Sequence, residues 1–318
     1  MSRGLRACLW LVLAIASLAC SAAGPQVRPP PPPVAGDDAL LPAETAAFAK
    51  GQLAPADLRC LPRQRWSTSL RADARFTAGQ ILDELGRHGA TLPDDKREAA
   101  RKQLVDTLFW RLVLTQLVEG DMHNLGAVPL GGLVGSDGKP LLLIRTSFTP
   151  APERAGSCVQ SLVGAGNVRH IVNLYAGPMP TEQLEVAERK AVEGVGGTYY
   201  TARGDPHGGW REDLREGDGG EGKKAAMIAV ATLIKAQILH PGGAAPKGNV
   251  QVHCGGGMHR TGMVVGVFDR CVNKSPWVDV AAAYKRHVGW RSDSEPGGFE
   301  PQNLAFIESF ECGLLEPQ

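Results

Sequence analysis

The chain shows two successive patterns of apolar and polar residues. Before residue 125 apolar residues recur at helical spacing, as at Leu104, Leu108 and Leu112, which predicts helices over residues 77–88 and 94–119. The second of these follows the start signal Pro93-Asp94-Asp95 and ends before Gly120. We interpret the two helices as a small helical extension over residues 61–125.

From residue 126 onward, short apolar runs alternate with helical patterns. The runs predict strands over residues 141–145, 170–174, 197–202 and 250–253. The helical patterns cover residues 181–193, 223–240, 263–271, 278–288 and 302–310. Strands that alternate with helices predict an α/β domain, 126–318, with a mainly parallel central sheet flanked by helices.

The first 20 residues have the pattern of a targeting segment. Arg3 and Arg6 precede an apolar run over residues 7–19, which is short for a membrane span. Residues 17–21 resemble a bacterial lipoprotein processing site, which implies cleavage before Cys20 and lipidation of its thiol. Ser17 departs from that pattern, because an aliphatic residue usually stands there. Ordinary signal cleavage near Ala19 or Ala22 is the alternative. Both readings predict export to the cell envelope, as an anchored lipoprotein or as a secreted or periplasmic protein.

A proline-rich stretch follows the targeting segment. Residues 29–33 are five consecutive prolines, which favour an extended tether. We therefore predict a linker over residues 21–60.

Composition limits the classes of function. The chain has 318 residues, 43% hydrophobic content and a formal net charge of +1, so it can bury a full core and shows no basic excess for nucleic acid. Seven cysteines occur, without the spacing of a zinc site. If Cys8 leaves with the signal, Cys20 is lipidated and Cys254 is reactive, four remain. This even number permits two disulfides in an exported protein, with the pairing open, among Cys60, Cys158, Cys271 and Cys312.

The most informative segment is 253–262, His-Cys-Gly-Gly-Gly-Met-His-Arg-Thr-Gly. It joins an apolar strand pattern to an apolar helix pattern. A glycine loop at this junction turns successive backbone N–H groups toward a bound anion, and the helix N-terminus adds its positive end. These groups and Arg260 should favour the thiolate of Cys254. A thiolate beneath a tetrahedral oxyanion can attack its central atom.

This segment resembles the signature loop of the cysteine-dependent protein tyrosine phosphatases, in which His-Cys is followed, after five residues, by Arg-Thr-Gly or Arg-Ser-Gly. Residues 141–150, 168–174 and 302–307 resemble the entry segment, a strand and the terminal helix of the atypical dual-specificity branch. The resemblance covers about residues 126–312 and implies the fold of that superfamily.

The resemblance implies a role for each residue of the loop. Cys254 would be the nucleophile, Arg260 would clamp two oxygens of the phosphoryl group, and Thr261 would donate its hydroxyl to the thiolate. His253 would orient the loop. The substrate would be bound at Gly255, Gly256, Gly257, Met258 and His259, although His259 could instead face solvent.

Two further residues carry expectations. Gln302 resembles the glutamine that positions the hydrolytic water, with an ordinary surface residue as the alternative. Asp205 stands where the family has its general acid, but it lies 49 residues before Cys254, more than is usual. Asp218, at 36 residues, and Asp213 between them are the alternatives. Seven glycines among residues 204–222 suit a mobile lid or a plain surface loop.

The resulting prediction is a phosphatase that hydrolyses phosphomonoesters through a cysteinyl-phosphate intermediate, acting on phosphotyrosine proteins or with dual specificity. An inositol phosphate or phosphoinositide phosphatase is an alternative, weakened because no lysine lies between Cys254 and Arg260. An inactive phosphate-binding scaffold lipoprotein is another. We expect no metal or organic cofactor. The expected partners are a phosphorylated protein or small phosphomonoester and, through a lipid on Cys20, the membrane, but no nucleic acid.

Overall fold

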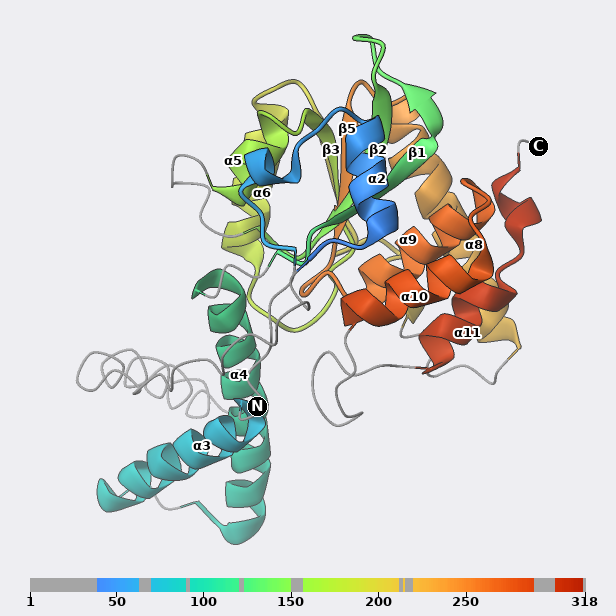
Figure 1. Ribbon diagram of the computed structural model, residues 1–318. Coiled ribbons are helices and arrows are strands. Elements are labelled where there is room, and N and C mark those ends of the chain that lie inside the picture. Colours follow the sequence, from blue (N-terminus) through green and yellow to red (C-terminus); the bar gives the residue numbers. More distant parts are fainter. Residues whose placement is uncertain are drawn as a thin grey trace. The chain divides into compact units, whose positions relative to one another are not determined.

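The computed structural model describes residues 39–62, 70–89, 92–119, 123–149, 157–211, 214, 220–288 and 301–316. Within them the chain forms a five-stranded sheet in the order β1-β2-β5-β3-β4 (Figure 1). The strands are β1 (Gly126–Val134), β2 (Pro140–Thr146), β3 (Val168–Asn173), β4 (Thr198–Thr201) and β5 (Asn249–His253). Only the β1–β2 pair is antiparallel among these neighbours. The predicted α/β class with a mainly parallel sheet is therefore confirmed.

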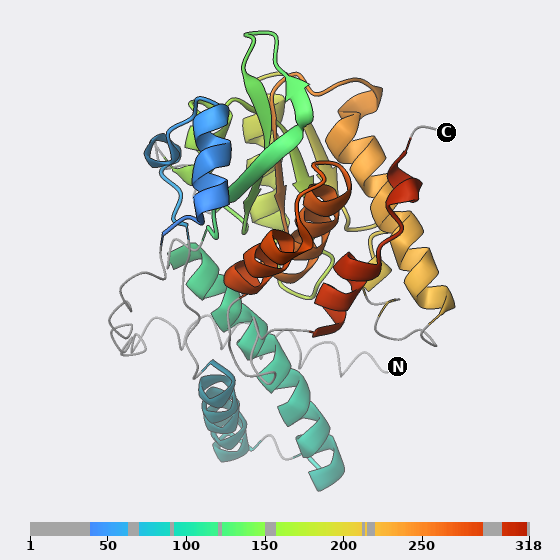
Figure 2. The ribbon, with the colours of Figure 1, turned by 45° about the vertical axis from the view of Figure 1, so that its right-hand side comes forward.

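Helices cover both faces of this sheet (Figures 1 and 2). Leu142 and Ile144 of β2 belong to one apolar core, while Leu141 and Leu143 belong to the other. The first core lies under α2 (Pro42–Lys50), α5 (Cys158–Val163) and α6 (Glu182–Glu193). The second lies under α8 (Glu221–Leu233), the π-helix η2 (Ile234–Leu239), α9 (His259–Cys271), α10 (Trp277–Val288) and α11 (Pro301–Ser309). Parallel strands buried on both faces are continuous apolar runs, which is why the sequence revealed them.

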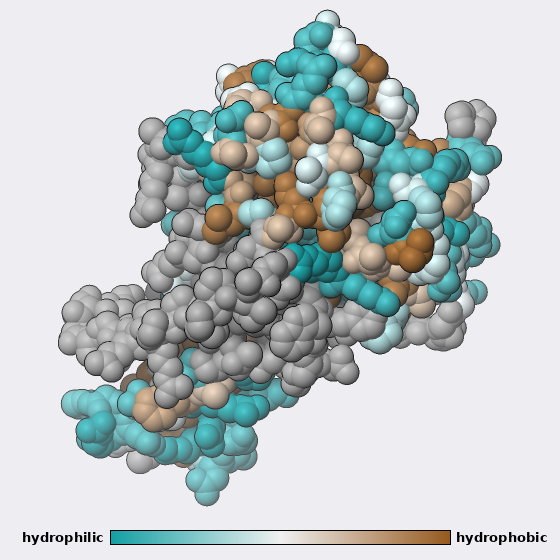
Figure 3. All heavy atoms as spheres, viewed as in Figure 1, coloured by the Kyte–Doolittle hydropathy of each residue, from teal (hydrophilic) through white to brown (hydrophobic). Residues whose placement is uncertain are grey.

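Two long helices, α3 (Leu70–Arg87) and α4 (Asp94–Glu119), pack against each other. Ala74 and Phe109 are buried in this pair, and the Arg71 guanidinium lies 4.2 Å from the centre of the Phe109 ring. Hydrophilic residues cover most of what Figure 3 shows of the pair. The predicted bounds of α4 are confirmed, whereas α3 begins seven residues before the predicted start at residue 77. Within the described ranges, neither these helices nor any other combines the length and apolar character of a membrane span.

The predicted linker over residues 21–60 is too long. Its C-terminal part folds into α2 and the short 3-10 helix η1 (Pro55–Leu58), and both Phe48 and Leu58 are buried in the first core. Alanines dominate α2 and give it no apolar stripe. Its first residue is Pro42, which suits a helix start. The N–H group at this position has no acceptor within the helix, so proline loses no hydrogen bond there.

The sequence did not predict β1, because Pro129 and the Gly131-Gly132 pair interrupt its apolar pattern. An edge strand tolerates proline, since one row of its N–H groups needs no partner strand.

Two disulfides form, Cys60–Cys158 and Cys271–Cys312. Among the described residues Cys254 is the one free cysteine. The four cysteines that the sequence left as candidates thus pair with each other. The first bridge ties the segment after η1 to α5, and the second ties α9 to the segment after α11.

Candidate active site

The predicted signature loop lies between the central strand and α9. Cys254 directly follows β5, and α9 begins at His259. Gly257 has φ +66°, and a Cβ there would collide with the carbonyl oxygen of Thr146. Glycine is therefore required at this position for two reasons, the backbone angle and the contact with β2. The loop occupies the carboxyl end of the sheet, where α/β proteins usually bind ligands.

The carbonyl groups of the loop are held from behind by the surrounding framework. The carbonyl oxygen of Cys254 lies 3.3 Å from Nδ1 of His253, and that of Gly255 accepts from the backbone N–H of Phe148 at 3.2 Å. The first half of the loop is thus fixed to β5 and to the segment that follows β2.

The second half of the loop is held in the same way. Asn124 donates from Nδ2 to the carbonyl oxygens of Gly256 and Gly257 at 3.3 and 3.1 Å. The buried guanidinium of Arg145 donates to the Gly257 carbonyl at 2.6 Å. Four successive carbonyls, from Cys254 to Gly257, therefore face donors of the framework.

This arrangement fixes the direction of the backbone N–H groups. The peptides of the described residues are trans, so each N–H points opposite to the carbonyl of the same peptide unit. The N–H groups of Gly255, Gly256, Gly257 and Met258 are consequently directed away from the framework, to the other side of the loop. Successive backbone N–H groups on one side of a loop, next to a helix N-terminus, are the features of an anion-binding nest.

The Cys254 thiol lies at the base of the loop and is 6% exposed. Burial by itself raises its pKa, but the neighbouring hydroxyl and backbone N–H of Thr261, with the charges of Arg260 and His253, outweigh burial and lower the pKa. A lowered pKa increases the thiolate fraction at neutral pH, and the thiolate is the nucleophilic form.

The other predicted loop residues lie beside this thiol or at the start of α9. Arg260 and Thr261 are buried in the first turn of α9, and Met258 is buried just before it. His259 is half-buried as the first residue of the helix. These residues thus lie close to Cys254 in the structure, as their nearness in sequence predicts. Their catalytic roles remain predictions.

His253 forms a fully buried pair with Glu188 of α6. Its Nε2 lies 3.0 Å from Oε2 of Glu188, and both side chains have no exposed area. Its ring also meets the ring of Phe148 edge-on, with centroids 4.7 Å apart. Burial lowers the pKa of His253, but the charge of Glu188 at this short distance outweighs burial and raises the pKa.

A second buried network supports the loop from α2 and α10. His287 contacts Asn124 Oδ1 through Nδ1 at 2.7 Å and Glu44 Oε1 through Nε2 at 2.6 Å. Burial raises the pKa of Glu44, yet His287 and Arg145, with a hydrogen bond from the Leu41 N–H, lower it overall. Through Asn124 and Arg145, this network ends on the carbonyls of Gly256 and Gly257.

Arg145 remains a cation in this network. Burial lowers its pKa to about 10, against the opposing effects of Glu44, Cys254 and Tyr284. At neutral pH its guanidinium is therefore charged beneath the loop.

Asp205 lies in the turn after β4. Its carboxylate accepts from the Tyr200 hydroxyl at 2.9 Å and from the His207 N–H at 2.7 Å. The structure thus places it at the carboxyl end of β4, in the same sheet as β5, without testing its role as an acid. The alternatives Asp213 and Asp218, and the lipidation candidate Cys20, lie outside the described residues.

Gln302 is exposed at the start of α11. The buried residue of that turn is its neighbour Asn303, which donates to the Tyr284 hydroxyl at 2.9 Å. The exposure of Gln302 agrees with the surface alternative, and the assignment to the hydrolytic water gains no support.

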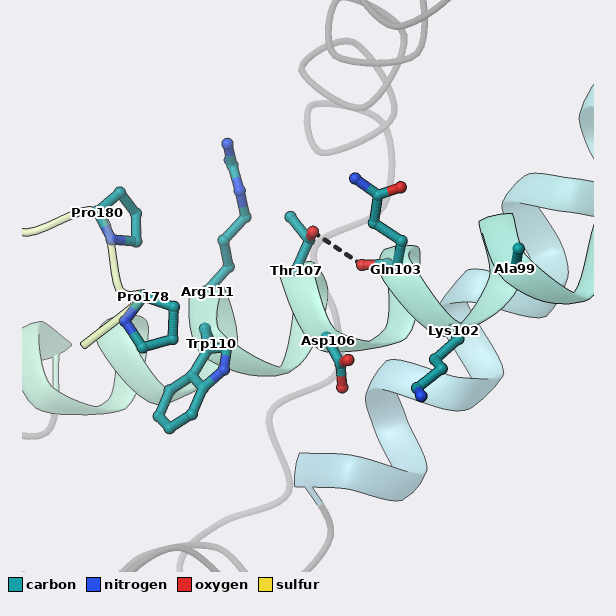
Figure 4. A pocket seen from close by; sticks show the side chains of 9 residues that line it. All are labelled: Ala99, Lys102, Gln103, Asp106, Thr107, Trp110, Arg111, Pro178 and Pro180. Atoms are coloured by element: carbon teal, nitrogen blue, oxygen red, sulfur yellow. Dashed lines mark hydrogen bonds between the residues drawn. The ribbon is translucent and has the colours of Figure 1, made fainter. Parts of the chain in front are cut away.

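A groove of about 780 Å³ lies apart from the loop, between α4 and the turn 178–180 (Figure 4). Trp110 and Arg111 line the groove from α4, and Pro178 and Pro180 line it from the turn. Met179, between the two prolines, packs on the other side, where its side chain abuts Gly255. One short turn thus separates the groove from the signature loop.

The polar residues that support the loop were missed at the sequence level. Glu188 follows Leu184 by four residues and precedes Val192 by four, so it occupies the apolar face of α6. Arg145 similarly follows four apolar residues in β2. A charged residue at a core position was the available signal. The partner of Glu188 could not be predicted from the sequence, because His253 is 65 residues away.

Among the described residues no group of three or more His, Cys, Asp or Glu side chains has the arrangement of a metal site. Comparison of the chain with family models, curated proteins and solved structures gives no match.

Proposed function

We propose that the protein is a phosphatase that hydrolyses phosphomonoesters through a cysteinyl-phosphate intermediate. The observation that carries the proposal is the combination, in one loop, of the Cys254 thiol, whose pKa is lowered, with four backbone N–H groups directed to one side and with the first turn of α9. A tetrahedral dianion fits this combination of partial and full positive charge.

In the first step the Cys254 thiolate attacks phosphorus, a sulfur–phosphorus bond forms, and the bond from phosphorus to the ester oxygen breaks. The loop N–H groups and the Arg260 guanidinium stabilise the equatorial oxygens, on which charge increases in the transition state. The leaving oxygen takes a proton from a general acid, which we assign to Asp205.

In the second step water attacks the phosphorus of the thiophosphate, and the sulfur leaves as a thiolate. The hydroxyl and the backbone N–H of Thr261 both favour the thiolate form of that sulfur. These two donors stabilise the departing thiolate and make it a better leaving group. The Asp205 carboxylate takes a proton from the attacking water, so the step releases inorganic phosphate and regenerates both the Cys254 thiolate and the acid.

For the substrate we propose phosphotyrosine proteins, with or without activity on phosphoserine and phosphothreonine. No lysine lies within the loop to add charge for a polyphosphorylated inositol ring. We further propose that the chain acts in the cell envelope, anchored through Cys20, as its first residues indicate.

The test is turnover of three substrates by the purified full chain: a phosphotyrosine peptide, a phosphoserine peptide and inositol hexakisphosphate. We expect preference for the phosphotyrosine peptide, competitive inhibition by vanadate and no inhibition by EDTA. Cys254→Ser should abolish turnover. Preference for the inositol phosphate would replace the substrate assignment.

Turnover that survives in Cys254→Ser would overturn the mechanism. If the folded wild-type chain turns over none of the substrates but binds phosphate, the protein is a phosphate-binding scaffold instead.

A further inference from the structure

Glu188 is a fully buried carboxylate that receives hydrogen bonds from Thr149 and Tyr199 and forms an ion-pair contact with His253. Oε1 accepts from the backbone N–H and the hydroxyl of Thr149 at 3.0 and 2.9 Å. Oε2 accepts from the Tyr199 hydroxyl at 3.4 Å and lies 3.0 Å from Nε2 of His253. Both oxygens of this carboxylate thus face N–H or O–H groups, which can donate to them.

The contacts of His253 define its protonation state. Nδ1 faces the carbonyl oxygen of Cys254, which can only accept, so Nδ1 carries a proton. Nε2 faces the ionised carboxylate of Glu188, so Nε2 also carries a proton. A ring with a proton on both nitrogens is an imidazolium cation, and its charge forms an ion pair with Glu188. This cation is adjacent in sequence to Cys254 and is hydrogen-bonded to its carbonyl group.

We propose that Glu188 is a positioning residue that keeps His253 doubly protonated beneath Cys254 and thereby keeps the Cys254 thiol ionised. The proposal deepens the proposed function and rests on its reactive cysteine. Glu188 would not touch the substrate. It would act through His253, both by charge and by holding the ring that fixes the first carbonyl of the loop.

The other charged and titratable groups near this pair are compatible with the assignment. On the Glu188 side these are Tyr199 of β4, whose pKa is raised chiefly by burial and by Glu188, Glu185 of α6, and the Arg189 guanidinium 4.8 Å from the Tyr199 ring centre. Tyr199 therefore stays neutral and donates.

On the Cys254 side the neighbouring charges are Arg260 of α9 and Arg145 of β2, and both are positive. Tyr175, whose pKa burial raises to about 12, is neutral there. Within the described part of the chain, Glu188 is thus the carboxylate that contacts His253.

The experiment measures the rate at which iodoacetate alkylates Cys254, resolved by peptide mass spectrometry on the full chain, between pH 5 and pH 9. Glu188→Gln keeps the size of the side chain but removes its charge. We expect about ten-fold slower alkylation than wild type near pH 6, because an opposite charge is lost, and convergence of the two rates at high pH. Glu185→Gln, on the same helix and paired with Arg203, is the matched control and should follow the wild-type profile.

Equal profiles for Glu188→Gln and wild type would overturn the proposal. A uniform loss of rate at every pH would also overturn it, because that result indicates a distorted loop and not a change in ionisation. Alkylation does not depend on phosphatase turnover, so this test stays separate from that of the proposed function.

A second measurement needs no variant. The imidazole ¹⁵N shifts of His253 in the wild-type chain should show both nitrogens protonated at pH 7. A neutral His253 ring at that pH would contradict the proposal even if Glu188→Gln fails to fold.

Discussion

The reactivity of Cys254 results from a small number of individual groups whose effects oppose burial. A thiol in a buried site is normally harder to ionise, and Thr261 together with the charges of Arg260 and His253 reverses this for Cys254. The orientation of the loop backbone is also fixed, because each of four successive carbonyl groups faces a hydrogen-bond donor of the framework. Single side chains thus determine both the charge and the orientation of the site.

The general acid can be identified by substitution of single carboxylates. Asp205→Asn should lower kcat about 100-fold for an alkyl phosphate, whose leaving group needs a proton. The loss should be smaller for nitrophenyl phosphate, whose leaving group is stable as an anion. Steady-state kinetics on both esters measure the difference. A larger loss in Asp213→Asn or Asp218→Asn would assign the acid to that residue instead.

His170 should make the folded state sensitive to mild acid. Its Nδ1 faces the Thr198 hydroxyl and its Nε2 accepts from the Lys247 N–H, while burial, with Lys247 and Arg169, lowers its pKa from 6.5 to about 4. Between these values the unfolded chain binds the proton and the folded chain does not. The stability from neutral His170 is therefore complete above pH 6.5 and decreases as pH falls toward 4.

Chemical denaturation at several pH values measures this effect. His170→Gln should show a shallower decrease in unfolding free energy between pH 6.5 and pH 4 than wild type. His88→Gln, which removes an exposed histidine, should not change the slope. An unchanged slope in His170→Gln would show that this ring does not titrate as described.

At the scale of elements, α2 and α10 are joined beneath the loop by a buried ion pair. Oε1 of Glu44 in α2 lies 2.6 Å from Nε2 of His287 in α10. Asn124, before β1, links this pair to the loop carbonyls. An N-terminal segment that the sequence assigned to a linker is thus part of the framework of the site.

Removal of Glu44 should destabilise the fold strongly. Glu44→Ala leaves the His287 side chain without its buried partner, which typically costs about 3–5 kcal/mol of unfolding free energy. Thr45→Ala, an exposed neighbour on α2, should change stability by less than about 0.5 kcal/mol. Denaturant unfolding of the three proteins measures both values. A loss below about 1 kcal/mol for Glu44→Ala would contradict a structural role for the pair.

Elements with strong periodicity could be predicted from the sequence, and the others could not. α4 has the predicted bounds because its apolar spacing and both of its end signals agree. β1 and α2 were missed because Pro129 in β1 and the alanines of α2 leave no period to recognise. At the site, Cys254, Arg260 and Thr261 were predictable because they share one segment. Glu188 and Asn124 were not, because only the fold brings them to the loop.

At the scale of the whole molecule, two disulfides connect distant parts of the chain. Cys60–Cys158 closes a separation of 98 residues and Cys271–Cys312 one of 41. Closure of loops of this length lowers the conformational entropy of the unfolded chain. In the chain-entropy account this stabilises the folded state by about 4–5 kcal/mol per bridge. Disulfides persist in oxidising compartments, which agrees with the export that the N-terminal segment predicts.

Loss of the longer bridge should lower thermal stability without removing the thiol of the site. In Cys60→Ser/Cys158→Ser we expect a clear decrease in Tm, with Cys254 still alkylated by iodoacetate. Calorimetry on the oxidised chain gives the comparison, and the wild-type chain with reductant serves as the second reference. Equal Tm values for the oxidised wild type and the variant would show that the bridge adds no stability.

The most direct test of the account is to trap the covalent intermediate. The full chain is mixed with a phosphotyrosine peptide and quenched in acid within the first turnovers, and its peptides are then examined by mass spectrometry. We predict phosphate on Cys254 in the wild type and a larger amount in Thr261→Ala, whose thiolate leaves more slowly. Turnover with no phosphate on Cys254 in either protein would contradict the cysteinyl-phosphate mechanism.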